Sequence, residues 1–274
     1  MKVEKLQPLL AWEDLEWSDP DGGRIILHGT LPTVIFPLKM RPREEWEGIA
    51  LLEAPDVVEL WVQEEIDEAE SPGVNLNHSL LSGGALAIYL DDVTELEGVV
   101  SGRFPDPEPR RLHRNAVRHQ RPVYFIEPTA DDDDEWLEHL GNEAKVVSHW
   151  RKLLGMISLG GKWRKRMKQN ISKARNPPKG VTKNMGSASV LALTWWQLSE
   201  WLINESISSY RDNRFAMRLR GALADLRSTH GDNATLILPM HMPWRNAIFS
   251  ALNEQHDVEE ITSSPTVSDG IEEE

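Results

Sequence analysis

Four side chains near the ends of short apolar segments could transfer protons or bind a metal ion: His28, Glu59, Glu127 and His241. Gly29 and Thr30 end the same segment as His28 and are expected to line the same pocket. The segments are 24–30, 57–62, 122–127 and 234–238, and each has the composition of a buried strand. In a parallel sheet, ligands bind at the carboxyl ends of the strands, so we expect these side chains to converge on one pocket. Two imidazoles and two carboxylates suit zinc or manganese, and they also suit general acid–base catalysis.

Each of these side chains also has a purely structural interpretation. A single histidine after a strand, such as His241, is often an ordinary loop residue. An acid inside an apolar strand, such as Glu59, needs a partner, and Arg211 could supply it in a structural ion pair. Glu127 could simply be a solvent-facing acid at a strand end. Both interpretations stay open until the arrangement of the strands is known.

Strands alternate with amphipathic helices along most of the chain. This pattern predicts an α/β fold with a central, mostly parallel sheet and flanking helices. We expect helices at 43–54, 80–90, 110–120, 146–157, 190–205, 209–227 and 244–254, and a helix N-terminus after the acidic run 131–134. The expected organisation is an acidic extension (1–23), one domain (24–258) with a basic helical insertion at about 136–205, and a disordered acidic tail (259–274).

Several function classes are excluded or disfavoured by composition. The 274 residues include no cysteine, so disulfides, thiolate metal sites and cysteine nucleophiles are excluded. Glycine-rich nucleotide-binding motifs, GxSxG and HExxH are all absent. No segment has the roughly 18 apolar residues of a membrane span, and the N-terminus does not read as a signal peptide, so we expect a cytoplasmic protein. The net charge of −14 disfavours nucleic acid as a partner.

Basic residues are concentrated in one part of this acidic chain. Residues 144–199 contain 12 Lys and Arg and no Asp or Glu, while the remainder carries a net charge of −26. The candidate surface-binding residues there are Arg151, Lys152, Lys162, Arg164, Lys165, Arg166 and Lys168. The simplest interpretation is a helical cap with a solvated cationic face. The alternatives are docking of the amphipathic segment 146–157 on an anionic membrane, self-association through the 144–183 region, and, less favoured, binding of nucleic acid phosphates.

The order of the motifs resembles that of the TraB/PrgY-like family, over roughly residues 24–256. IILHGT at 25–30 resembles the family's first strand and GTxH loop, and PDVVEL at 55–60 resembles its next strand. PVYFIEP at 122–128, YRDNRFA at 210–216 and the segment 234–249 are similar to the family's later strand, ERDxxMA helix and GAGH turn. The wider group includes Tiki-type metalloproteases and erythromycin-esterase-like proteins. The resemblance implies a metal-dependent hydrolytic site, with Glu59, Arg211 and His241 as catalytic residues and Asp212 in the pocket.

The sequence departs from the family pattern at several of these positions. Pro32 stands where the first loop has its histidine, and Leu238 stands where the last turn has its leading glycine. His28 would have to replace the lost ligand, giving a metal set of His28, Glu59 and His241. Because a metal site needs three or four ligands in fixed geometry, we expect a degenerate, non-catalytic binding or regulatory protein without a cofactor. The alternatives are an active hydrolase or peptidase that uses zinc or manganese, and a peripheral membrane protein.

Overall fold

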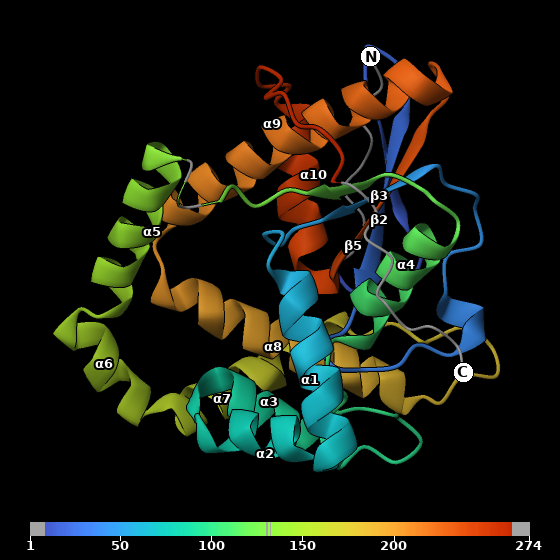
Figure 1. The fold of residues 1–274 in the computed structure, drawn as a ribbon. Coiled ribbons are helices and arrows are strands. Elements are labelled where there is room, and N and C mark those ends of the chain that lie inside the picture. Colours follow the sequence, from blue (N-terminus) through green and yellow to red (C-terminus); the bar gives the residue numbers. More distant parts are fainter. Residues whose placement is uncertain (1–8, 130, 132, 265–274) are drawn as a thin grey trace.

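The protein is described by a computed structural model that covers residues 9–129, 131 and 133–264 (Figure 1). Its centre is a five-stranded sheet with the order β1-β2-β5-β3-β4. The strands are β1 (Leu15–Ser18), β2 (Arg24–Thr30), β3 (Gly48–Leu51), β4 (Val123–Phe125) and β5 (Thr235–His241). The β1 strand is antiparallel to β2, and all other neighbours are parallel. The expected α/β fold with a mostly parallel sheet and flanking helices is therefore confirmed.

Helices cover both faces of this sheet. They are α1 (Val57–Glu70), α2 (Val74–Leu81), α3 (Gly84–Thr94), α4 (Pro107–Arg118), α5 (Asp134–Val147), α6 (Trp150–Ile157), α7 (Leu159–Asn170), α8 (Asn184–Leu202), α9 (Glu205–His230) and α10 (Arg245–Asn253). Because side chains of a strand alternate between faces, Leu27 and Leu238 pack with α9 and α10, while Ile26 and Ile237 pack with α4 and α1. None of the described helices combines the length and apolar character that a membrane-spanning segment requires.

The first and last parallel strands were correctly predicted from their apolar runs. The β2 strand spans the predicted residues 24–30, and β5 pairs with it in parallel from Arg24 opposite Thr235 to Thr30 opposite His241. Residues 239–243 were expected to form a loop, but 239–241 continue β5 and the turn η3 (Met242–Trp244) follows. These extra residues place His241 in the last pair of the ladder between β2 and β5, opposite Thr30.

The second parallel strand lies earlier in the chain than we expected. Residues 43–54 were predicted to be helical, but Gly48–Leu51 form β3, whose four residues are all buried between β5 and β4. Residues 57–62 were predicted to be a strand, but they begin α1, in which Trp61 is the buried side chain. A short, fully buried apolar run does not distinguish a strand from a helix by its periodicity. Glu59 consequently lies on a helix rather than in the sheet.

A second hydrophobic core lies beyond the carboxyl ends of the strands. Leu31 and Met242, which follow β2 and β5, pack there with α3, α7 and α8. The turns η1 (Leu38–Met40) and η2 (Ile171–Lys173) adjoin the same core. In Figure 1, α5, α6 and α7 form an arc from the start of α9 to this helical layer.

The amphipathic segment 146–157 is not one helix. The α5 helix ends at Val147, and the Ser148 hydroxyl donates a hydrogen bond back to the Ala144 carbonyl. His149 then caps α6 by accepting a hydrogen bond from the Arg151 N–H. The Gly160-Gly161 pair, which we expected to interrupt the helix, lies inside α7.

Both ends of the described chain are joined to the sheet. The acidic extension contributes the edge strand β1. Residues 259–264, part of the tail expected to be disordered, are held by side-chain and backbone hydrogen bonds. The Glu259 carboxylate accepts hydrogen bonds from Arg214 and Arg218, and the Ser264 N–H donates to the Val123 carbonyl. The rest of the tail lies outside the described residues.

A buried ion pair joins the N-terminal turn to α9 and gives a first testable prediction. Arg220 Nε lies 3.0 Å from the carboxylate of Asp19, which is 6% exposed. Asp19→Asn should lower the free energy of unfolding by about 3 kcal/mol, because it leaves the Arg220 charge buried without its main partner. Urea unfolding measures this change. The control Asp21→Asn removes an exposed contact to the same arginine and should cost less than about 1 kcal/mol. Equal losses in both variants would contradict the prediction.

Candidate functional site

The carboxyl ends of β5 and β3 form a topological switch point. After β3 the chain enters α1, and α1 and α4 pack on one face of the sheet. After β5 it enters η3 and α10, and α10 packs on the other face. Adjacent parallel strands whose connections leave on opposite faces have an open space between their ends, which is where ligands bind in open α/β sheets. His241, at the end of β5, lies at this point.

His241 is paired with a carboxylate that the sequence analysis missed. Its Nε2 atom lies 3.6 Å from Asp106 Oδ2, and both side chains are partly exposed. The ring of Trp195, from α8, meets the imidazole edge to face at a centroid distance of 5.1 Å. The imidazole is therefore positioned by an acid on one side and an indole on the other, rather than standing free in a loop.

Asp106 occupies the N-cap position of α4 without capping that helix. An N-cap side chain bonds the N–H of the second or third helical residue, and here the third is Pro109, which has none. Instead, Asp106 Oδ1 accepts a hydrogen bond of 3.3 Å from the Thr33 N–H. The Asp-Pro-Glu-Pro sequence at 106–109 was a signal that this acid could be directed elsewhere, but we interpreted it only as a proline-rich loop.

Glu53 is the acid that follows the second parallel strand. It lies two residues beyond β3, and its carbonyl accepts a hydrogen bond of 3.4 Å from the Glu127 N–H. Although the residue exposes much of its area to solvent, desolvation by surrounding atoms raises the pKa of its carboxyl. His241 lowers this pKa, and the charges of Asp106 and Asp56 raise it. These couplings place Glu53 in one electrostatic group with His241 and Asp106.

Glu127, expected in the pocket, joins this group through Glu53. Burial, and to a smaller extent the charge of Glu53, raise the pKa of Glu127 to about 7. The Trp136 indole acts in the opposite direction, although its N–H completes no hydrogen bond within normal geometry among the described residues. We refer to Glu53, Asp106, Glu127 and His241 as the strand-end cluster.

Thr30 and Gly29 support the strand-end cluster differently. Thr30 pairs with His241 in the ladder and is fully buried, and its hydroxyl has no hydrogen-bond partner among the described residues. Gly29 packs against the buried guanidinium of Arg245, which would lie 2.8 Å from an added Cβ. Gly29 is therefore a packing requirement, and only Thr30 lies beside the imidazole.

The residues proposed as metal ligands are not assembled into one site. His28 is 2% exposed, and its Nδ1 atom lies 2.7 Å from Asp14 Oδ1. Glu59 is an exposed residue of α1. Within the described ranges, no group of three or more His, Asp or Glu side chains has the arrangement to hold a metal ion. The donor set His28, Glu59 and His241 does not fit a metal centre.

Arg211 and Asp212 belong to a neighbouring aromatic cluster. Arg211 donates hydrogen bonds to Asp212 and to Glu200, at 3.0 and 3.2 Å, so Glu59 is not its partner. Its guanidinium lies 4.5 Å from the ring centroid of Trp244, whose indole N–H donates to Asp212. Trp244 ends η3, directly after β5, and its ring stacks on Trp196 at 4.9 Å. Arg211 is thus connected to the strand-end cluster through η3.

The basic residues of the insertion are divided between packed and exposed positions. Lys162 lies 3.7 Å from the ring centroid of Trp201 and donates to the Gly155 carbonyl, and Lys152 donates to the Trp201 carbonyl. Arg151 lies over the ring of Trp150. The exposed members are Arg151 on α6 and Arg164, Lys165, Arg166 and Lys168 on α7.

The raised pKa of Glu127 predicts a pH-dependent stability. The folded chain retains a proton on Glu127 up to a pH of about 7, whereas the unfolded chain releases it near 4.5, so this group lowers the free energy of unfolding as pH rises through that window. Glu127→Gln should therefore stabilise the protein by roughly 1–3 kcal/mol at pH 8 and hardly at all at pH 4. Urea unfolding of both proteins across this range measures the difference. Glu135→Gln, at an exposed position of α5, is the control, and an equal effect there would contradict the assignment.

No family model, curated protein or solved structure matches the chain. The resemblance to TraB/PrgY-like proteins therefore continues to rest on the short motifs in the sequence. The function is argued below from the chemistry of the strand-end cluster.

Proposed function

We propose that the protein binds a small organic cation at the strand-end cluster and that His241 exchanges protons with it. The observation that carries this proposal is the His241–Asp106 pair at the switch point of the sheet, and both charges act on the pKa of Glu53. A histidine beside a carboxylate is a common general base, because the carboxylate orients the ring and stabilises its protonated form.

The electrostatics of the cluster favour a positively charged ligand. The Glu53 charge raises the pKa of Glu127, and the Asp106 charge raises the pKa of Glu53. A bound cation would relieve this repulsion without moving any carboxylate. The half-buried indole of Trp195 beside His241 supplies a face that attracts cations, as the placement of Arg211 over Trp244 illustrates for a neighbouring indole.

The TraB-like assignment remains a proposal of a more specific kind. It would make the protein a degenerate relative of metal-dependent hydrolases that binds a ligand without turnover. The strand-end cluster supports binding in either case, and the His241–Asp106 pair favours the alternative of an active enzyme. Turnover of a bound ligand separates the two.

Glu53→Gln should weaken cation binding. Calorimetric titration at pH 8 with agmatine, spermidine and choline is expected to show binding of at least one of them. We expect the affinity to fall as the pH is lowered to 5, because carboxyls with raised pKa values become protonated. Glu53→Gln should lower the affinity about tenfold or more, as expected for the loss of one charge-assisted contact.

Glu59→Gln is the matched control, since it removes the same charge from an exposed position of α1. It should leave the affinity unchanged. Equal weakening by both variants, or binding of succinate in preference to every cation, would overturn the proposal. Mass spectrometry of the incubated ligand tests for turnover, which His241→Gln should abolish if the protein is an enzyme.

A second candidate function is docking on an anionic membrane through α6. Four of its side chains are exposed hydrophobics: Trp150, Leu153, Leu154 and Ile157. Figure 1 shows α6 in the middle of the arc, at the edge of the molecule and away from the sheet. The next helix, α7, exposes its basic residues, and no acid occurs in residues 144–199. Apolar side chains flanked by cations are typical of helices that lie in a membrane interface.

The double variant Leu153→Asp/Ile157→Asp should abolish this docking. Vesicles that contain phosphatidylserine are expected to carry the native protein upward in a flotation gradient at low salt, and the variant should remain at the bottom. Leu38→Asp/Leu81→Asp changes two exposed hydrophobics of other elements by the same charge and is the control. Absence of flotation, together with a native protein that is dimeric by light scattering, would assign the α6 face to self-association instead.

A further inference from the structure

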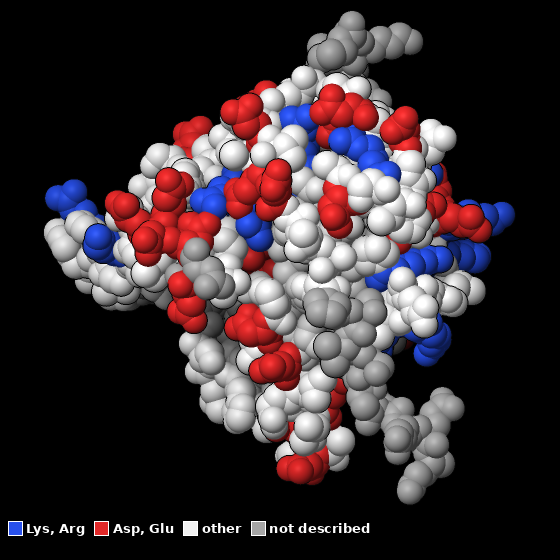
Figure 2. All heavy atoms as spheres, turned by 45° about the horizontal axis from the view of Figure 1, so that its top comes forward, with Lys and Arg blue, Asp and Glu red and all other residues white. Residues whose placement is uncertain are grey.

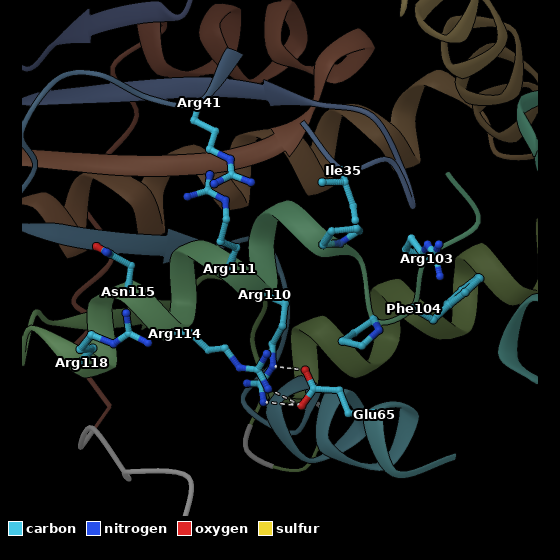
Figure 3. A pocket seen from close by; sticks show the side chains of 12 residues that line it. Ile35, Arg41, Glu65, Arg103, Phe104, Arg110, Arg111, Arg114, Asn115 and Arg118 are labelled. Carbon is cyan, nitrogen blue, oxygen red and sulfur yellow. Dashed lines mark hydrogen bonds and ion pairs between the residues drawn. The ribbon is translucent and has the colours of Figure 1, made fainter. Parts of the chain in front are cut away.

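A groove rich in arginine lies along the exposed side of α4 (Figure 3). Its volume is about 710 Å³, which is within the range of small-molecule sites. The charged residues that line it are Arg41, Arg103, Arg110, Arg111, Arg114, Arg118 and Glu65. In Figure 2, acids are spread over most of the visible face, while Lys and Arg gather at the right-hand edge, the side on which Figure 1 shows α4.

The buried carboxylate of Glu108 and the backbone of Phe36 hold two of these arginines at one place. Glu108 is fully buried, and its two oxygens accept hydrogen bonds from the Phe36 N–H, at 2.9 Å, and from Arg111, at 2.6 Å. The Phe36 carbonyl accepts a hydrogen bond of 3.2 Å from Arg41 Nε. One peptide segment and one acid therefore fix both guanidinium groups, and Figure 3 shows both directed into the same part of the groove. The single charge of Glu108 leaves this pair with an excess of positive charge.

The opposite wall is fixed in a similar way. Glu65 of α1 receives two hydrogen bonds from Arg110, at 2.9 and 3.0 Å, and one from Arg114, at 2.7 Å. Among the described residues, the side chains of Arg103 and Arg118 make no hydrogen bond or ion pair. Within the described part of the chain, six arginines thus face two carboxylates, Glu65 and Glu108.

This excess of positive charge has a cost that the fold does not require. Arg110, Arg114 and Arg118 are spaced four residues apart on one helix, and each such like-charged pair destabilises a helix by about 0.2–0.5 kcal/mol. The chain has 44 acidic residues, so carboxylates are available to neutralise the stripe. Since two carboxylates, Glu65 and Glu108, face the six arginines within the described residues, the groove favours an anionic ligand.

We propose that the groove binds the phosphate group of a small phosphorylated organic molecule. Guanidinium groups bind phosphate oxygens through paired hydrogen bonds, and Arg41 and Arg111 offer such a site with little freedom left to lose. Ile35, Phe104, Pro105 and Pro107 form an apolar wall that accommodates the organic part. This inference is independent of the proposed cation site, which lies on the other side of the 103–107 segment and has the opposite charge.

Arg41→Gln tests the proposal, because Arg41 is half-buried and its side chain makes a single hydrogen bond, to a backbone carbonyl. The full chain is titrated calorimetrically with pyrophosphate, glucose 6-phosphate and ATP, and with glucose and adenosine. We expect at least one phosphorylated probe to bind and neither uncharged probe to do so. Arg41→Gln should weaken that binding about tenfold or more, and Arg41→Lys should weaken it less, since the charge remains.

Arg164→Gln, on the exposed side of α7, removes the same charge outside the groove and should leave the affinity within about twofold, since single surface charges contribute little at a distance. Arg111 is not varied, because its loss leaves Glu108 buried without its cation. The proposal is overturned if no phosphorylated probe binds, or if Arg164→Gln weakens binding as much as Arg41→Gln. It is equally overturned if a single-stranded RNA or vesicles with phosphatidylinositol phosphates bind and the small probes do not.

Discussion

The insertion of β5 between β2 and β3 is the interaction on which the rest of the structure depends. It pairs residues separated by most of the chain, from Arg24 with Thr235 to Thr30 with His241. The pairing buries apolar side chains on both faces of the sheet, so a shift of one residue would exchange them between the two faces and disrupt the packing of both cores. The same register fixes the distance of His241 from the ends of its neighbours. The geometry of the strand-end cluster is thus a consequence of core packing, not of its own polar contacts.

The sequence predicted that the site lies at the carboxyl ends of the strands, but it did not identify all of the residues that form the site. The apolar runs of β2, β4 and β5 are flanked by turn residues, and their positions follow from the sequence. The β3 strand and α1 are the exception, because Gly48–Leu51 is too short and too uniformly buried to reveal its periodicity. We therefore expected the second strand nine residues too late, beginning at residue 57 instead of 48, and chose Glu59 in place of Glu53.

Asp106 and the arginine groove show a different limit of sequence reasoning. Both depend on side chains that leave their own helix to meet distant segments: Asp106 bonds Thr33, and Glu108 bonds Phe36. The helix itself was expected, and so was its basic character. The periodicity of the sequence does not reveal the path of residues 31–41. This segment passes along the first turn of α4, and its backbone N–H groups donate hydrogen bonds to both acids. Contacts between segments far apart in sequence require the tertiary fold.

The first turn of α4 separates two sites of opposite charge. Its acids, Asp106 and Glu108, lie at the end where the helix dipole favours negative charge, and Arg118 lies at the other end. Asp106 faces His241, while Glu108 faces away and anchors Arg111. Negative charge is therefore concentrated at the strand ends and positive charge in the groove, on either side of the same helix. A ligand bound on either side therefore changes the electrostatic field at the helix end that both sites share.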